Sequence, residues 1–347
     1  MHGLFKKTLS ILFISLIIFT CSTTVFAATS GFCGTNATWS FDETSGMLTV
    51  SGTGPTTNYT NQTFVPWRRY KDQITGITIE QGITEIGNYL FNGCEKVSQI
   101  IIPDSVTVIG YSSFDNCTSL ESITIPASVT EISNAPFYNC ISLKSITVDP
   151  ENKSFASDES GTLYNIAKTN LIQYPAGRTD ANFAVPDTIE TLSFGAFANC
   201  KYLFNVILPD SVTKIDSMCF VGCFSLEVIT LSKNLTMIGE MAFSECLNLK
   251  DVYYTGTQND WNQISVRSDN NYLTNAVFHY TEKGPETVKG KPIEDIVINT
   301  DKEKTDEEKA ETARKFVIPL VIGIAILIII FVSILIYVIF KKKPDKE

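Results

Sequence analysis

A repeating pattern in residues 86–254 constrains the fold of this chain more than any other feature of its sequence. Six cysteines, at positions 94, 117, 140, 200, 223 and 246, are separated by steps of 23, 23, 60, 23 and 23 residues. A phenylalanine lies three residues before each cysteine, a leucine or valine lies three residues after it, and an isoleucine or leucine lies five residues before each phenylalanine. A fixed period of this length is typical of a solenoid, in which each turn buries its apolar side chains only against neighbouring turns.

The same period predicts short strands. Apolar residues lie six and eight positions after each cysteine, as Ile100 and Ile102 do after Cys94. Period-two alternation places such pairs inward on a strand, and stacked copies form a parallel ladder with a spacing of about 4.8 Å. The residues between them must then point outward. We interpret these outward residues as a partner-binding surface: Gln99, Ile101, Ser122, Thr124, Ser145, Thr147, Asn205, Ile207, Val228, Thr230 and Tyr253.

The repeat units resemble those of a known family. Ile-Thr-Ile-Pro-Ala-Ser-Val-Thr-Glu-Ile at 123–132, followed by Phe137, Cys140 and Leu143, is similar to the BspA-like leucine-rich repeats, and the likeness runs from about Gly76 to Tyr254. The flanking segments 32–54 and 253–280 resemble the β-rich N-terminal cap and the C-terminal element of these proteins. The resemblance implies a curved leucine-rich repeat solenoid of short parallel strands. It also implies surface display and the binding of host or matrix proteins.

One unit departs from the period. The step of 60 residues between Cys140 and Cys200 exceeds two periods by about 14 residues. Residues at about 155–178 contain turn-forming residues between apolar stretches, and we expect a projecting β-hairpin there. Insertions in solenoids map to loops, often on a binding face. A spacer that only interrupts the stack explains the insertion equally well.

The two ends of the chain predict export and anchoring. Residues 1–27 have a basic start, an apolar centre and small residues before Ala28, as in a secretory signal peptide. Residues 316–340 are uncharged and long enough for a transmembrane helix, and the lysines that follow indicate a cytoplasmic tail at 341–347. The expected topology is therefore single-pass in the cell membrane, with the N-terminus outside and the ectodomain on the cell surface. The remaining predicted segments are an N-terminal cap at 28–75, a solenoid at 76–256, a C-terminal cap at 257–281 and a charged stalk at 282–315.

Composition argues against several kinds of chemistry. The chain has only two histidines, and one of them lies in the predicted signal peptide, which disfavours zinc sites and histidine-based triads. A net charge of −10 disfavours nucleic-acid partners. The repeat cysteines alternate with core residues, so we interpret them as free buried thiols. We assign no catalytic, cofactor-binding or metal-binding residue.

The sequence leaves three functional hypotheses. The first is a membrane-anchored cell-surface recognition or adhesion protein, with no enzymatic activity, that binds an extracellular, host or matrix protein through the outward ladder. The second is a structural or spacer protein of the envelope whose binding is confined to the hairpin insertion. The third is a surface enzyme that acts on glycans through a carboxylate pair; the repeats offer no convergent pocket for it.

Overall fold

A computed structural model describes residues 29–281, together with the backbone at 287–288 and 291–292. The chain separates into two compact units, 1–284 and 285–347. In the second unit, β24 (Thr287–Val288) pairs antiparallel with β25 (Lys291–Pro292). The predicted signal peptide at 1–27, the transmembrane segment at 316–340, the tail at 341–347 and nearly all of the stalk at 282–315 lie outside the described residues. Within the described residues, no helix is both long and apolar enough to cross a membrane.

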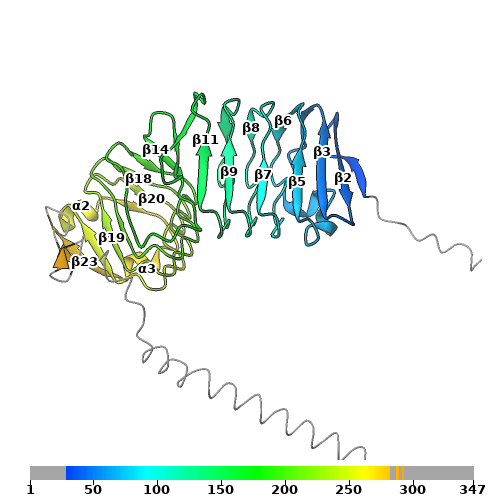
Figure 1. The fold of residues 1–347 in the computed structure, drawn as a ribbon. Helices are drawn as coiled ribbons and strands as arrows, with labels where there is room; N and C mark the ends of the chain where they lie inside the picture. The colour runs from blue at the N-terminus through cyan, green and yellow to red at the C-terminus, as the bar shows by residue number, and fades with distance from the viewer. Residues whose placement is uncertain (1–28, 282–286, 289–290, 293–347) are drawn as a thin grey trace, which may run out of the picture. The chain divides into compact units, whose positions relative to one another are not determined.

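Residues 29–281 form a β-solenoid of about nine turns, which confirms the repeat fold (Figure 1). Its N-terminal half contains two sheets. Sheet A has seven strands, and sheet B has four. In spatial order, sheet A consists of β1 (Ser30–Phe32), β2 (Ala37–Asp42), β3 (Met47–Gly52), β5 (Gly76–Ile79), β7 (Gln99–Ile101), β9 (Ser122–Ile125) and β11 (Ser145–Val148). Sheet B consists of β10 (Glu131–Ile132), β8 (Val108–Ile109), β6 (Ile83–Ile86) and β4 (Gly54–Pro55).

The C-terminal half contains sheets C and D, with seven and five strands. Sheet C consists of β12 (Phe155–Ser157), β13 (Leu163–Asn165), β14 (Asn170–Gln173), β16 (Thr191–Leu192), β18 (Lys214–Ile215), β20 (Met237–Ile238) and β22 (Ser265–Val266). Sheet D consists of β15 (Asn182–Ala184), β17 (Asn205–Ile207), β19 (Val228–Leu231), β21 (Asp251–Tyr254) and β23 (Val277–Tyr280). Two short helices, α2 (Gln258–Trp261) and α3 (Asn271–Thr274), lie between β21 and β23 in the chain.

The N-terminal segment covers one end of the stack. Strands β1, β2 and β3 pair antiparallel, and β3 then pairs parallel with β5, so the first strands continue directly into the repeat ladder. Two 3-10 helices follow, η1 (Gln62–Phe64) and η2 (Arg68–Tyr70). Trp39 and Trp67 are both buried, with ring centroids 5.7 Å apart. These two rings close the end of the core that an open solenoid exposes.

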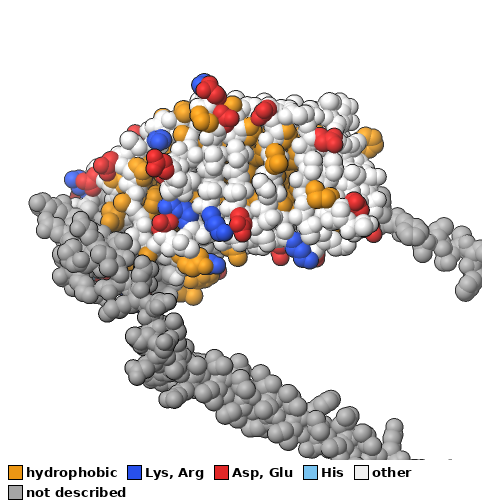
Figure 2. Space-filling view, in the orientation of Figure 1, with side chains coloured by type: hydrophobic (Ala, Val, Ile, Leu, Met, Phe, Trp, Pro, Cys, Tyr) orange, Lys and Arg blue, Asp and Glu red, His pale blue; other side chains and the backbone are white. Residues whose placement is uncertain are grey.

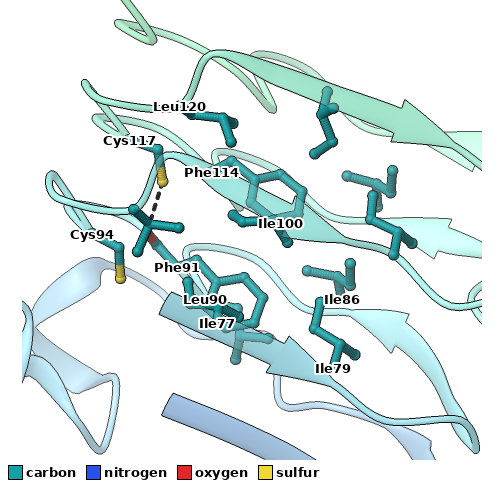
Figure 3. Close-up of a cluster of buried hydrophobic side chains, with 14 of the residues drawn as sticks. Ile77, Ile79, Ile86, Leu90, Phe91, Cys94, Ile100, Phe114, Cys117 and Leu120 are labelled. Atoms are coloured by element: carbon teal, nitrogen blue, oxygen red, sulfur yellow. Dashed lines mark hydrogen bonds between the residues drawn. The ribbon is translucent and has the colours of Figure 1, made fainter. Parts of the chain in front are cut away.

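Each turn adds the same buried residues to the core. In the register of sheet A, Ile146 lies beside Ile123 and Ile123 beside Ile100, one period apart. The phenylalanine rings stack from turn to turn, with centroids 5.7 Å apart for Phe91 and Phe114 (Figure 3) and 4.8 Å apart for Phe197 and Phe220. The predicted inward positions of the strands are therefore confirmed.

The repeat cysteines have a specific role in this packing. The Cys117 thiol donates a hydrogen bond of 3.4 Å to the backbone carbonyl of Phe91 in the preceding turn (Figure 3). The corresponding bonds are 3.2 Å for Cys140, 3.0 Å for Cys223 and 3.1 Å for Cys246. All eight cysteines of the described residues are free and buried. The interpretation of the ladder as reduced core thiols agrees with this structure.

The turn beside each cysteine explains a second feature of the repeat. The residue before each cysteine has a left-handed backbone, with φ between 55° and 79°. Such a conformation favours glycine and asparagine. Five of the six positions carry one of these residues, and the sixth is Glu245: Gly93, Asn116, Asn139, Asn199, Gly222 and Glu245.

The insertion differs from the expected projecting hairpin. Strands β12, β13 and β14 form an antiparallel meander, and β14 pairs parallel with β16. Phe155, Leu163 and Tyr164 are buried. Their apolar side chains alternate along the strands, so burying them draws the strands into the sheet and the core. Only the connecting turns, around 159–160 and 166–168, are fully exposed.

The insertion also divides the solenoid. Sheets A and D do not pair with each other, because β11 is the last strand of sheet A and β15 is the first of sheet D. The free edge of β11 is covered instead by the insertion: Ile146 N donates to Gly161 O at 3.0 Å, and Val148 N donates to Ser157 Oγ at 3.0 Å. One buried cluster runs from Cys33 to Leu163, and a second runs from Tyr164 to Leu273. The ring of Tyr174 begins the second stack, 5.3 Å from Phe197.

Candidate binding surface

Six of the predicted surface residues come together on the outer face of sheet A. In the strand register, Ser122 lies beside Gln99 and Ser145, and Thr124 lies beside Thr147. Ile101 is 72% exposed and Ser145 is partly exposed, while the other four are exposed. We call this set the sheet A ladder: Gln99, Ile101, Ser122, Thr124, Ser145 and Thr147.

A shallow hollow of about 190 Å³ lies on this ladder. Gln99, Ile101, Ser122 and Thr124 line it together with residues that the sequence interpretation missed, among them the acidic Asp104 and Asp149. Their only signal in the sequence is their place beside the prolines that follow the strands, Pro103 and Pro150. The hollow therefore combines hydroxyl and amide groups and one exposed isoleucine with two carboxylates.

The row of hydroxyl side chains also extends into the N-terminal strands. Thr78 of β5 lies in register with Ile101, and Thr49 of β3 lies in register with Thr78. These two residues escape repeat-based reasoning because the N-terminal strands do not follow the 23-residue period. Figure 2 shows the face that carries β3 to β11 as mostly uncharged, with hydrophobic side chains among polar ones and charged side chains mainly toward its borders.

The other predicted residues behave differently, and three of them are not at the surface. Asn205, Val228 and Thr230 on sheet D are only 2%, 4% and 3% exposed. Their predicted outward exposure was therefore wrong. Thr230 lies in register between Ile207 and Tyr253, and Val228 between Asn205 and Asp251, so larger side chains on both sides shield them.

Ile207 and Tyr253 are partly exposed. The Tyr253 ring stacks on His279 of β23, with centroids 4.5 Å apart, and His279 Nε2 lies 2.8 Å from Asp251 Oδ1. Burial, assisted by the nearby Asp251 carboxylate, raises the pKa of Tyr253. This outer face is thus occupied by contacts among its own side chains, unlike the sheet A ladder.

No group of three or more metal-ligating side chains gathers among the described residues. Burial raises the pKa of the Cys94 thiol to about 12 and that of Cys117 well above its usual range. Since the thiolate is the nucleophile and the metal ligand, these cysteines are poorly suited to either role. The chemistry that the outer face of sheet A can provide is non-covalent binding.

Comparison with known proteins agrees with the repeat. A family model described as the BspA type leucine rich repeat region matches residues 69–180 and 178–282, in six copies. Among curated proteins, none matches.

Several solved structures are similar over much of the chain. A leucine-rich repeat protein from Eubacterium ventriosum ATCC 27560 is 26% identical, with a TM-score of 0.47, over 65% of this chain and 72% of that one. The pneumococcal vaccine antigen PcpA is 18% identical, with a TM-score of 0.44, over 69% of this chain and 87% of that one. A leucine rich cell surface protein from Faecalibacterium prausnitzii A2-165 is 21% identical, with a TM-score of 0.35, over 67% and 97% of the two chains.

Proposed function

Because this chain belongs to the BspA-type leucine-rich repeat proteins, we propose that it is a recognition protein that binds another protein through the sheet A ladder. The observation that carries the proposal is the exposure of this ladder. Its side chains stand in register on neighbouring strands and are not occupied by contacts of the kind that hold Tyr253.

The chemistry of the ladder suits a broad partner. Hydroxyl and amide groups form hydrogen bonds at modest cost, and Ile101 offers apolar area at 72% exposure. The hollow on the ladder is shallow, whereas drug-sized ligands are usually held in pockets of roughly 300–1,000 Å³ that bury most of their surface. A flat, mixed polar and apolar face is the usual composition of a protein–protein interface.

We further propose that the chain is displayed at the cell surface, held in the membrane by residues 316–340, and that its partner is an extracellular host or matrix protein. The support for this step is the sequence alone, namely the signal-like residues 1–27 and the uncharged apolar run. Adhesion follows if the ladder binds matrix components while the apolar run anchors the chain.

The ladder is tested with cells that express the full chain and with a panel of purified matrix proteins. The variant Ile101→Glu/Thr124→Glu/Thr147→Glu places three charges on the ladder and is expected to abolish binding. A matched control, Thr107→Glu/Thr130→Glu/Thr213→Glu, adds the same charge at exposed threonines outside sheet A and is expected to bind normally. Since all six residues are exposed, thermal unfolding should change little in either variant. Binding that survives the first variant, or is lost equally in both, excludes the ladder.

One observation favours an alternative. Ile166, in a turn of the insertion, is 52% exposed. If the protein is mainly a spacer whose binding is confined to the insertion, Ile166→Glu will remove binding and the ladder variant will not.

A further inference from the structure

A second hollow, of about 220 Å³, lies beside the N-terminal strands, and none of its lining residues belongs to the sheet A ladder. It is formed where the segment that contains η1 and η2 packs on the first repeat turn. The residues that line it include Gln62, Val65, Trp67, Arg68, Lys71 and Asn92.

The base of this hollow is firmly held. Trp67 is 1% exposed, and its ring lies 5.7 Å from that of Trp39 and 6.0 Å from that of Phe91. The Asn61 side chain accepts a 2.9 Å hydrogen bond from Thr63 N and thereby caps η1. The site is therefore built on the aromatic end of the core, and a ligand would meet a largely preformed surface.

The hollow carries uncompensated positive charge. Lys144, Lys214, Lys233 and Lys250 each have a carboxylate within 4 Å, whereas neither Arg68 nor Lys71 forms an ion pair within the described part of the chain. The whole chain has a net charge of −10, so two unpaired cations at one hollow stand out from their surroundings. A guanidinium presents parallel donors that match the two oxygens of a carboxylate.

A buried polar atom beside these cations also lacks a partner. Asn92 is 8% exposed; its Nδ2 donates to Asp115 Oδ2 at 2.9 Å, while its Oδ1 has no hydrogen-bond partner. Leaving such an acceptor unpaired is costly, and a ligand hydroxyl would satisfy it. Gly93, with φ +79°, leaves space open next to it: a Cβ at that residue would lie 3.5 Å from Lys71 Nζ and 3.6 Å from Gln62 Oε1.

We propose that this hollow binds a carboxylate-bearing sugar residue of an acidic glycan. Arg68 and Lys71 take the carboxylate, Gln62 and Asn92 take ring hydroxyls, and the side chain of Val65 contacts the apolar face of the ring. The volume equals that of about seven water molecules, which leaves room for one sugar ring. A peptide C-terminus would supply the carboxylate but amide donors in place of hydroxyls.

This glycan site is independent of the protein-binding ladder, because the two surfaces share no residue. The purified full chain is titrated with glucuronic acid by calorimetry and by saturation-transfer NMR, with glucose and an acetylated dipeptide as comparison ligands. We expect glucuronic acid to bind at least tenfold more tightly than either. Arg68→Gln and Lys71→Gln should each weaken that binding at least about tenfold, because each removes a hydrogen bond to a charged group.

Arg69→Gln is the matched control. Arg69 adjoins Arg68 in the same 3-10 helix, but its guanidinium lies 5.5 Å from the Tyr70 ring and does not line the hollow. Its affinity for glucuronic acid should stay within twofold. Equal losses in the Arg68 and Arg69 variants would mean diffuse attraction, and glucose binding as tightly would remove the role of the carboxylate. Tighter binding of the dipeptide would make this a peptide site, and no measurable binding of glucuronic acid would end the proposal.

Discussion

The two halves of the solenoid use one repeat to make different exteriors. Thr124 and Thr230 hold the same position in their units, seven residues after Cys117 and Cys223, yet Thr124 is exposed and Thr230 is 3% exposed. Ser122 and Val228 form a second such pair, exposed in the N-terminal half and 4% exposed in the C-terminal half. The inward positions show no such difference, since Ile123 and Ile229 are both buried.

The contrast shows what the period controls. Inward side chains meet copies of themselves one turn away, so the 23-residue period alone determines their environment. Outward side chains depend on whichever residues stand beside them in register, and these vary from strand to strand. A binding face therefore belongs to particular turns, here those of β7, β9 and β11.

The largest effect is expected from breaking the phenylalanine stack in one half only. Phe114→Ala should lower the free energy of unfolding by about 3–5 kcal/mol, because it leaves a cavity in a closed core. Since the buried clusters divide between Leu163 and Tyr164, amide hydrogen exchange should accelerate mainly before residue 163. Phe220→Ala is the counterpart and should accelerate exchange mainly after it. Uniform acceleration in both variants would show that the halves unfold as one unit.

A smaller effect is expected at the junction of the halves. Arg178 donates to Asp180 Oδ2 at 2.8 Å and to Ser160 Oγ at 2.7 Å, and its guanidinium lies 4.5 Å from the Tyr174 ring centroid. Its side chain is only 12% exposed. Arg178→Ala should therefore cost about 2–3 kcal/mol and separate the calorimetric unfolding of the halves into two steps.

Lys214→Ala provides the comparison for the junction. It removes an ion pair with Asp216 whose side chains are 39% and 33% exposed, and should cost at most about 1 kcal/mol. A single calorimetric step in Arg178→Ala, with a loss no larger than this control, would remove the junction as the coupling element.

A pH-dependent effect is expected in the N-terminal half. Burial raises the pKa of Asp115 to about 6, although the side chain of Asn92 donates to it. The folded state thus favours the protonated carboxyl, so this contribution to stability is present below the unfolded pKa near 4 and is lost as the pH rises through 6. Asp115→Asn should stabilise the protein by about 1 kcal/mol at pH 7.5 and give no gain at pH 3.5, as measured by urea unfolding. The exposed Asp187→Asn should show no such pH dependence, and an equal gain at both pH values would contradict the assignment.

The smallest effect concerns backbone strain. Turns of the N-terminal half carry Gly93, Asn116 and Asn139 at the left-handed position, whereas the C-terminal half ends with Glu245 at φ +60°. Glu245→Asn should raise the melting temperature through a gain of about 0.5 kcal/mol, because asparagine tolerates this conformation better. Glu240→Asn, at an exposed residue outside the left-handed region, should not stabilise the protein. A loss in Glu245→Asn would indicate that the glutamate makes a compensating contact.

Periodicity predicts the interior of this protein well and its exterior only in part. Ile100, Ile102 and Phe114 were placed in the core because their offsets recur in every unit. Tyr174 could not be recognised as the replacement for a stacked phenylalanine, since it follows an insertion that hides the period. Thr230 failed because its exposure depends on Ile207 and Tyr253, which only the strand register brings together. Arg68 and Lys71 left a signal that repeat analysis overlooked, a cluster of bases in an acidic chain.

The buried thiols have a practical consequence for studies of this protein. Each repeat cysteine is hydrogen-bonded or packed within its own turn, and burial suppresses its thiolate. An alkylating reagent can therefore modify a given thiol only after that turn opens. The chain carries a natural row of chemical clocks, one per turn, whose labelling rates would time the opening of the solenoid from one end to the other without any engineered probe.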